Sequence, residues 1–434
     1  MNSKIFVQIA SYRDPELVST LKDCVFKADA PENLVFSIAW QHSPSEYEQV
    51  KPELDALSDK AQFKILEFPW QESKGVCWAR YQLQQQYDSE PYTLHLDSHH
   101  RFARGWDTYL INTFETLVRD GIKKPMLTTY VNNYRPMGSE SFYQETDPDP
   151  DSLNFLYTEP CADTSRLEQH GNGLVVSAFT HHGVPMHQAG HIKPSDAPTP
   201  GTLYSGHFCF AHGSFVSDVP HDPEIYFLGE ENTISLRAFT HGYDVFHPPK
   251  CVIWHEYMRM YTLHKHWSDH EEDKRSEIQD STVWHERDLT SQSRCRALFG
   301  TGDDSLELGK FGLGDVRTRD EFIQKSGIIY RKRALLNDNG KLVHNIEFKF
   351  DPSHFEGVDK SDIEMICCAA HTDNMFLIHR TDITQETHAE VWDRDEHFFY
   401  LKFESTLPPT RIVTWPCLKS GEWVNRRETC IWNE

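Results

Sequence analysis

The sequence predicts an α/β fold with a mostly parallel central sheet and a small β-rich domain at its C-terminal end. In the first hundred or so residues, apolar runs of strand length alternate with amphipathic stretches of helix length, and cap or turn residues separate them. From about residue 341 onward the sequence changes to short alternating segments, which are typical of antiparallel strands. We therefore expect a main domain over residues 1–335 and an accessory domain over residues 340–434.

The chain opens with a predicted strand followed by a helix. Residues 5–10 are mostly apolar and predict a buried strand, after which Asp14 and Pro15 provide a cap and a first turn for a helix. That helix has an apolar face, because apolar residues recur at helical spacing between Leu17 and Ala28. Repetition of this unit predicts a parallel sheet that binds its ligand at the carboxyl ends of the strands.

The remaining elements continue this alternation. We predict strands over residues 35–40, 63–68, 92–97, 126–131, 174–180, 203–211 and 243–246, and a further one that ends at His255. Helices are expected over residues 75–87, 106–119, 230–241, 263–299 and 318–325. The segment 136–169 is irregular, either an active-site flap or a surface excursion, and residues 181–200 are expected to form a long loop.

Composition and charge restrict the class of protein. Of the 434 residues, 38% are apolar and 25% charged, which is ordinary for a globular protein. The net charge of −23 argues against a nucleic acid or an anionic membrane surface as the main partner. Neither a signal peptide nor a membrane-spanning stretch is evident, so a cytoplasmic protein is expected. The ten cysteines are expected to be buried thiols.

The most informative motif stands at the end of the predicted strand 92–97. Side chains alternate across a strand, so Leu94 and Leu96 can enter the core, whereas His95, Asp97 and His99 share the opposite side. A carboxylate and an imidazole two residues apart can hold one divalent cation. We therefore predict a metal-dependent enzyme. The alternative is a capped strand end with a solvated histidine.

Six stretches stand out along roughly residues 4–330: IFVQIASYRDP (5–15), KGVCWAR (74–80), LDSHHRF (96–102), residues 206–220, FLGEEN (227–232) and GLGDVRT (312–318). Taken in order, these stretches resemble the cytosolic hydroxyproline N-acetylglucosaminyltransferases, the family that modifies the S-phase-kinase-associated adaptor of cullin ubiquitin ligases. The Asp-x-His element is also similar to that of the polypeptide N-acetylgalactosaminyltransferases. The resemblance implies a GT-A fold, a nucleotide-sugar donor and retention of configuration at the anomeric carbon.

The same resemblance assigns residues to the donor. It implies that the end of the first strand seats the nucleoside and that the turn before the helix at 75–87 closes on the nucleotide. The donor-binding residues it implies are Ala10, Ser11, Tyr12, Arg13, Gly75, Arg80, Asp97 and Ser98. Without it, the first group would be a polar turn and Arg80 a surface residue.

His255 is the candidate third metal ligand beside Asp97 and His99, since it matches the late histidine of the polypeptide transferases. Three protein ligands, diphosphate oxygens and water would complete an octahedral shell. Mn²⁺ is the preferred ion and Mg²⁺ the alternative. A core histidine is the competing interpretation of His255.

Two adjacent carboxylates, Glu230 and Glu231, follow Gly229 at the start of a predicted helix. They are the candidate catalytic residues, or else charges that complement the helix dipole. Neighbouring residues on a helix point about 100° apart, so the sequence leaves open which one faces the donor. His207 and Trp254 are expected on the acceptor side, with core packing as the alternative for Trp254.

We therefore expect a metal-dependent retaining glycosyltransferase that moves a sugar, with GlcNAc from UDP-GlcNAc as the first candidate, to a hydroxyl of a protein or glycan. No residue plainly offers a nucleophile on the far face of the sugar, which favours a front-face displacement. Two other classes stay open. They are a non-catalytic sugar- or nucleotide-binding module and a metal-dependent hydrolase.

Overall fold

The computed structural model describes residues 3–134, 172–180, 182–191, 193, 195–257, 259, 264–303, 305–350, 355–388 and 397–431. The chain divides into two compact units. The first comprises Met1–Val175, Gln188–Leu298 and Gly302–Phe322, and the second comprises Val176–His187, Phe299–Thr301 and Ile323–Glu434. The division into domains at residues 335–340 stays a prediction, because compactness alone does not show that either unit folds by itself.

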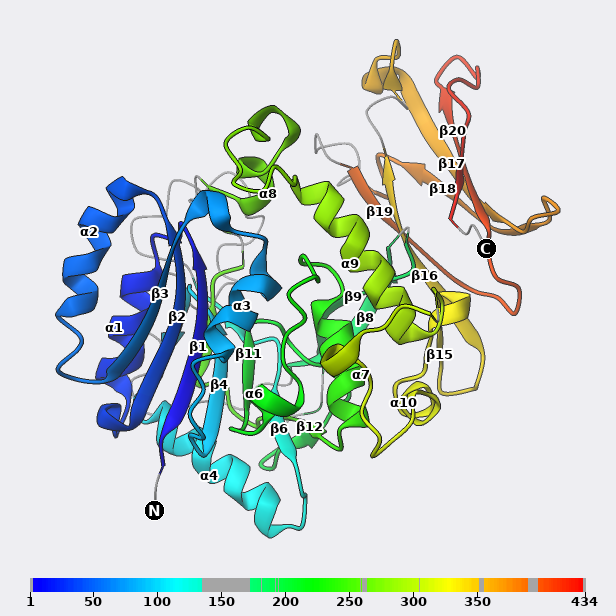
Figure 1. Cartoon of the computed structure of the whole chain (residues 1–434). Helices are drawn as coiled ribbons and strands as arrows, with labels where there is room; N and C mark the ends of the chain where they lie inside the picture. Colours follow the sequence, from blue (N-terminus) through cyan, green and yellow to red (C-terminus); the bar gives the residue numbers. More distant parts are fainter. Residues whose placement is uncertain are drawn as a thin grey trace. The chain divides into compact units, whose positions relative to one another are not determined.

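An eight-stranded sheet forms the centre of the first unit (Figure 1). Its spatial order is β10 (Thr199–Pro200), β12 (Asp244–His247), β6 (Pro125–Thr128), β11 (Phe208–His212), β4 (Tyr92–Asp97), β1 (Ile5–Tyr12), β2 (Leu34–His42) and β3 (Gln62–Pro69). The pairs β1–β2, β1–β4, β2–β3 and β6–β12 are parallel. Strand β11 runs antiparallel to both neighbours, and β10 is antiparallel to β12. The predicted α/β fold with a mostly parallel sheet is confirmed.

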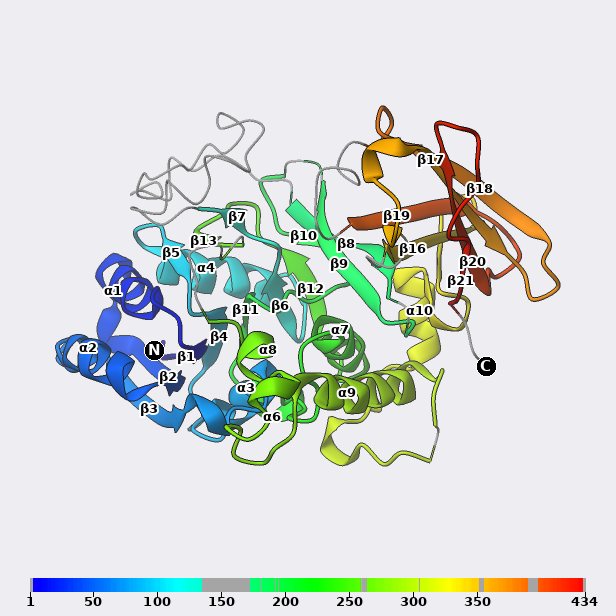
Figure 2. The same ribbon diagram turned by 90° about the horizontal axis from the view of Figure 1, so that it is seen from above.

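Helices cover both faces of this sheet. On one face the apolar sides of α1 (Leu17–Lys27), α2 (Pro44–Asp55) and α4 (Trp106–Arg119) pack in a single core with β1, β2 and β4. On the other face lie α3 (Val76–Gln84), α6 (Phe215–Asp218) and α7 (Glu230–Thr240). In both views α1 and α3 lie on opposite sides of β1 and β2 (Figure 1, Figure 2). Leu94 and Leu96 are fully buried, as the alternation in β4 predicts.

A second, three-stranded sheet follows the carboxyl end of β4. It consists of β5 (His100–Phe102), β13 (Ile253–His255) and β7 (Asn132–Asn133), with β13 antiparallel to β5 and parallel to β7. The register pairs His255 with His100. This pairing brings a residue from late in the chain beside the Asp97 to His99 turn. The helices α8 (His266–Asp269), α9 (Trp284–Phe299) and α10 (Arg319–Ser326) follow.

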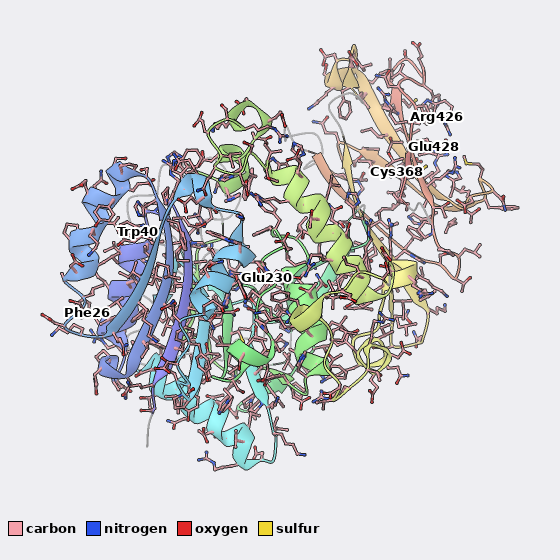
Figure 3. The ribbon with its side chains drawn as sticks, in the orientation of Figure 1. Phe26, Trp40, Glu230, Cys368, Arg426 and Glu428 are labelled. Atoms are coloured by element: carbon pink, nitrogen blue, oxygen red, sulfur yellow. The ribbon has the colours of Figure 1, made fainter. Side chains whose placement is uncertain are left out.

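The second unit is rich in β-strands. One sheet contains β14 (Ile328–Ile329), β15 (Ala334–Leu336), β16 (Leu342–Phe350) and β19 (His397–Glu404), together with residues 176–179 of β8 (Asn172–Phe179) and 185–187 of β9 (Pro185–His191). An antiparallel sheet contains β18 (Leu377–Thr384), β17 (Ile363–His371), β20 (Arg411–Leu418) and β21 (Arg427–Cys430). Ile346 and Leu401 of the first sheet share a core with Ile366 and Cys368 of the second. Figure 3 shows Cys368 in this β-rich part.

Several predicted elements differ from the observed ones. The expected loop 181–200 contains β9 and β10, and the strand predicted from residue 203 begins only at Phe208. Helix α2 was not predicted, because its Pro- and Glu-rich sequence buries only Leu54. The predicted helix 263–299 is split into α8, a turn and α9. The segment 136–169 lies outside the described residues.

Within the described part of the chain, no helix combines the length and apolar character that crossing a membrane requires. Eight of the nine cysteines in that part are buried, and Cys430 is exposed.

Candidate active site

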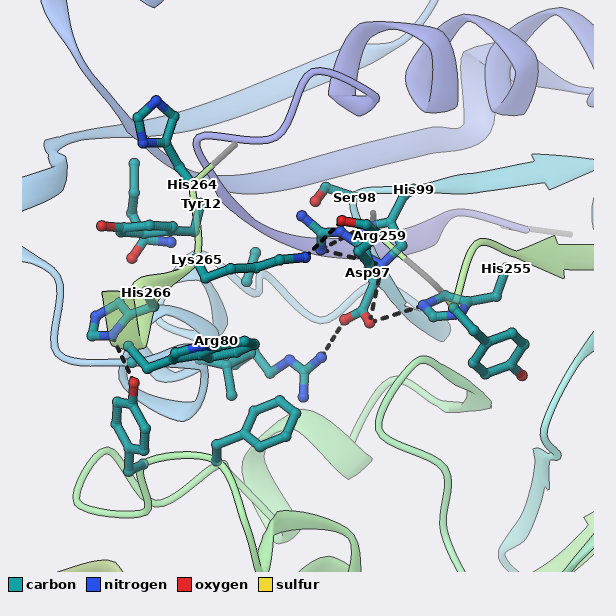
Figure 4. A pocket seen from close by; sticks show the side chains of 18 residues that line it. Tyr12, Arg80, Asp97, Ser98, His99, His255, Arg259, His264, Lys265 and His266 are labelled. Carbon is teal, nitrogen blue, oxygen red and sulfur yellow. Dashed lines mark hydrogen bonds and ion pairs between the residues drawn. The ribbon is translucent and has the colours of Figure 1, made fainter. Parts of the chain in front are cut away.

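A cavity of about 510 Å³ opens at the carboxyl ends of β1 and β4. Ala10 and Tyr12 at the end of β1 and Asp97, Ser98 and His99 at the end of β4 line it (Figure 4). Its other walls are built by Gln41, Gly75, Val76, Arg80, Tyr226, Phe227, His255, Tyr257, Arg259, His264, Lys265, His266 and Trp267. The cavity therefore lies where a parallel sheet is expected to bind its ligand.

The three predicted metal ligands come together on one wall of this cavity. Asp97, His99 and His255 each place a ligand atom within 4.8 Å of the other two. Oδ2 of Asp97 is 3.2 Å from Nε2 of His255 and 3.8 Å from Nε2 of His99. One carboxylate and two imidazoles that face a common point are suitable ligands for Mn²⁺ or Zn²⁺.

The ionisation of these residues also suits a cation. Burial and the neighbouring imidazoles hold the pKa of His255 well below its usual value, so the ring is neutral at physiological pH. Burial alone would raise the pKa of Asp97, but the charge of Arg80 and the hydrogen bond from His255 lower it well below the usual range. An ionised carboxylate and a neutral imidazole are the forms that bind metal. The residues present therefore fit a divalent ion.

Arg80 is held between two carboxylates. Helix α3 directs its guanidinium inward, where Nη2 donates to Oδ1 of Asp97 and Nη1 donates to Oε1 of Glu230. Its side chain is only 3% exposed. Because Arg80 occupies Oδ1 of Asp97, Oδ2 is the oxygen that faces His99 and His255. Arg80 also lines the cavity, and a direct contact with the donor diphosphate stays a prediction.

The structure separates the two adjacent glutamates. Glu230 is buried in the interior (Figure 3) and accepts hydrogen bonds from Arg80 and from Nε2 of His221. Glu231 is partly exposed and lies on the other side of the helix start, where Oε1 accepts from the Gly206 amide at 2.8 Å and Oε2 accepts from the Tyr130 hydroxyl at 2.8 Å. Neither carboxylate is among the groups that line the cavity.

A second group of residues has side chains of metal-binding types. It consists of His95, His221 and Glu230, and Glu230 contacts Arg80. Gln84 accepts the backbone amide of His221 through Oε1, which leaves its Nε2 to donate to Nδ1 of His221 at 2.9 Å. Nε2 of His221 then carries the proton and donates to Glu230 at 2.8 Å. Both ring nitrogens of His221 have hydrogen-bond partners, and the buried guanidinium of Arg80 donates to Glu230. These contacts indicate a hydrogen-bond network rather than a metal site.

Two cations that sequence reasoning missed, Arg259 and Lys265, line the cavity beside the predicted metal ligands. Nζ of Lys265 donates to the backbone oxygen of Arg259 at 2.8 Å (Figure 4). Partial burial and the charge of Arg259 lower the pKa of Lys265 to about 8. No local motif marks either residue in the sequence, because they follow the β13 strand as isolated basic residues.

The opposite part of the cavity is aromatic. The ring of Tyr12 lies 4.9 Å from that of His266, and the Tyr226 hydroxyl lies 2.9 Å from Nδ1 of His266. Gly75 packs against Tyr226 with a φ of +112°, and a Cβ there would lie 2.7 Å from Cδ2 of that ring. Only glycine fits this turn, which brings the start of α3 close to the cavity.

The remaining predicted residues are placed as follows. Ser11 is fully buried, and Arg13 turns away to Glu46 and Asp269, so neither lines the cavity. His207 is buried with its ring stacked 4.4 Å from that of His255, which places it next to one of the predicted metal ligands. Trp254 has no exposed surface and packs in the main core, so the expected acceptor contact is corrected to core packing. Strand alternation explains this, because His255 faces the site and its neighbour must face away.

The family described as Glycosyltransferase (GlcNAc) matches residues 4–64 and 46–331. No curated protein matches. Among solved structures, the chain is similar to GalNAc-T7 with UDP, GalNAc and Mn²⁺, with 13% identity and a TM-score of 0.41 over 74% of this chain and 55% of that chain.

Two further solved structures are similar over comparable lengths. TarS 1-349 of S. aureus in complex with UDP-GlcNAc gives 12% identity and a TM-score of 0.33 over 70% of this chain and 74% of that chain. The mannosyltransferase PcManGT from Pyrobaculum calidifontis in complex with GDP-Man and Mn²⁺ gives 11% identity and a TM-score of 0.33 over 71% of this chain and 77% of that chain. This chain spans about half the length of GalNAc-T7.

Proposed function

The chain belongs to the Glycosyltransferase (GlcNAc) family, and from this premise we propose that it transfers a sugar from a nucleotide donor to a hydroxyl acceptor with retention of configuration. UDP-GlcNAc is the proposed donor, and the acceptor is a hydroxyl of a protein or glycan, such as the hydroxyproline suggested by the resemblance in sequence. One observation supports this most strongly. Asp97, His99 and His255 converge on one wall of a cavity that also presents Arg259 and Lys265.

The proposed donor position follows from the chemistry of the walls. Tyr12, Tyr226 and His266 offer flat surfaces for a nucleoside, while Arg259 and Lys265 offer charge to a diphosphate. A divalent ion held by Asp97, His99 and His255, Mn²⁺ first and Mg²⁺ second, would supply positive charge to the diphosphate as it departs. Of the described residues that line the cavity, Asp97 alone carries a carboxylate. Asp97 is the proposed metal ligand, so no second carboxylate among these residues is left to act as a nucleophile. This supports the front-face displacement.

The test is release of UDP from a panel of UDP-sugars, with Mn²⁺ and with a chelator, in the presence and absence of hydroxyl acceptors. Turnover of UDP-GlcNAc that needs both metal and acceptor is the expected result. Hydrolysis that no acceptor accelerates would support a hydrolase instead. UDP binding without turnover of any donor, under every acceptor tried, would point to a binding module.

We propose that Glu231, rather than Glu230, orients the acceptor hydroxyl from outside the donor cavity, because Glu231 is partly exposed whereas Glu230 is buried with Arg80 and His221. Glu231→Gln is expected to lower kcat about 100-fold, since a misplaced reacting group typically costs that much, with little change in the free energy of unfolding. Glu230→Gln removes the negative charge that pairs with buried Arg80. We therefore expect its main effect to be a lower free energy of unfolding. The matched pair is compared by acceptor-dependent kcat and by urea denaturation. Equal kcat losses at unchanged stability would contradict the assignment.

Lys265 should make donor affinity depend on pH. Its pKa of about 8 means that the ammonium is charged below this pH and loses its charge above it. UDP affinity, measured calorimetrically with Mg²⁺, is therefore expected to fall between about pH 7.5 and about pH 9. Lys265→Arg keeps its charge over this range and should flatten the profile. An equally steep decline in this variant would assign the pH dependence to another group.

A further inference from the structure

We propose that Asp14 is a positioning residue of the metal centre, which fixes the proton of His99 on Nδ1 and so presents the Nε2 lone pair to the ion. The inference rests on the proposed function, because it concerns the metal ligands assigned there. In the sequence, Asp14 is notable only as a cap residue before a helix. In the structure, its Oδ2 contacts the candidate metal ligand His99.

The two oxygens of Asp14 have separate partners. Oδ1 accepts the backbone amide of Glu16 at 3.0 Å, which forms a local turn just before α1. The N-cap of α1 is Glu16, without a side-chain cap, and not Asp14 as the sequence predicted. Oδ2 accepts from the Ser98 hydroxyl at 2.6 Å and lies 2.7 Å from Nδ1 of His99. It also lies 3.4 Å from Nη2 of Arg259. The side chain is 1% exposed, so solvent does not compete for these contacts.

The contact with His99 defines where the imidazole proton lies. Oδ2 of Asp14 also accepts from the Ser98 hydroxyl at 2.6 Å and faces the Arg259 guanidinium at 3.4 Å, and these partners suit an ionised carboxylate. An ionised carboxylate at 2.7 Å from a ring nitrogen requires a proton between them, so Nδ1 carries it. In the neutral form of the ring the lone pair is then on Nε2, which is the atom 3.8 Å from Oδ2 of Asp97.

Arg259 does not compete for the same nitrogen. Its Nη1 lies 3.1 Å from Nδ1 and 3.4 Å from Nε2 of His99. A donor in the ring plane at Nδ1 would be much farther from Nε2, so the nearly equal distances place the guanidinium over the ring face. The arrangement of carboxylate, imidazole and prospective metal is one by which proteins set the tautomer and orientation of a ligand histidine.

The first experiment measures the tautomer of His99 in the metal-free full-length chain. Histidine ¹⁵N chemical shifts distinguish the two tautomers, and His99→Gln assigns the signal. We expect the Nδ1-protonated form in the wild type. Finding the Nε2-protonated form would overturn the proposal without any variant at position 14.

The second experiment compares Mn²⁺ affinity, followed by the EPR signal of free Mn²⁺, between the wild type and Asp14→Asn. The amide cannot satisfy both sides, because its NH₂ group must face either the Glu16 amide or the donors on Ser98 and His99. Loss of such a partner typically weakens metal binding by 10- to 100-fold. We expect a loss of about that size and a mixture of His99 tautomers in the metal-free variant.

Ser43→Ala is the matched control, since Ser43 caps α2 through its own side chain and lies outside the proposed metal centre. It should lower the denaturation midpoint without changing Mn²⁺ affinity. Equal Mn²⁺ affinity in Asp14→Asn and the wild type would overturn the positioning role alone. Absence of Mn²⁺ binding in the wild type would refute the metal centre of the proposed function, and this inference with it.

Discussion

Asp97→Asn is expected to lower kcat/KM for sugar transfer by at least about a thousandfold, which corresponds to roughly 4 kcal/mol of lost transition-state stabilisation. The asparagine can keep an oxygen toward Arg80 while its NH₂ group takes the place of Oδ2. Oδ2 is the atom that faces both His99 and His255. The substitution therefore removes the proposed metal ligand and preserves the volume of the side chain.

The readouts are acceptor-dependent UDP release and Mn²⁺ affinity, measured on the same preparation. Asp120→Asn, at the exposed end of α4, is the matched control and should retain full activity. A variant at Asp97 that binds Mn²⁺ as the wild type does would place the metal elsewhere. A variant that loses Mn²⁺ but keeps its turnover would show that transfer needs no metal at this position.

Arg80→Met should give the largest loss of stability, about 3–5 kcal/mol in the free energy of unfolding. The substitution leaves Asp97 and Glu230 without the cation that lies between them, and Arg80 and Glu230 are both buried. An unpaired buried carboxylate is costly because it has lost its hydration and gains no compensating charge. Urea denaturation in the presence of a chelator measures this loss without a contribution from bound metal.

A second substitution tests whether charge is the cause. Glu230→Gln added to Arg80→Met removes one of the two uncompensated charges, so the double variant is expected to be more stable than Arg80→Met alone. Arg275→Met, which breaks an exposed pair with Glu272 and Glu286, is the control and should leave stability within experimental error. A double variant less stable than Arg80→Met would indicate lost packing rather than unpaired charge.

The parallel sheet and the position of the ligand site could be predicted from sequence because both follow from local patterns. Apolar runs of strand length identified β1 to β4, and the rule that parallel strands bind ligands at their carboxyl ends located Asp97. Prediction was weaker where an element depends on distant partners. Strand β9 has a polar sequence and exists through its sheet neighbours, whereas α2 buries little and gives no periodic signal.

Within the candidate site, local sequence was enough to predict the residue types of two candidate metal ligands. Asp97 and His99 are two residues apart, so strand geometry alone brings them near each other. Similarity to known families added His255, which is 158 residues beyond Asp97. Its place beside them is produced by the pairing of β13 with β5, a contact that local pattern does not encode.

The partners of these candidate ligands depend on the tertiary structure. It directs Glu230 to Arg80 and Glu231 to Gly206, buries Trp254, and brings Arg259, Lys265 and Asp14 close to the candidate metal ligands. The physical reason is common to all of them. Periodicity states which face of an element a residue occupies, but the partner of a buried charge or hydrogen bond is set by how distant elements pack.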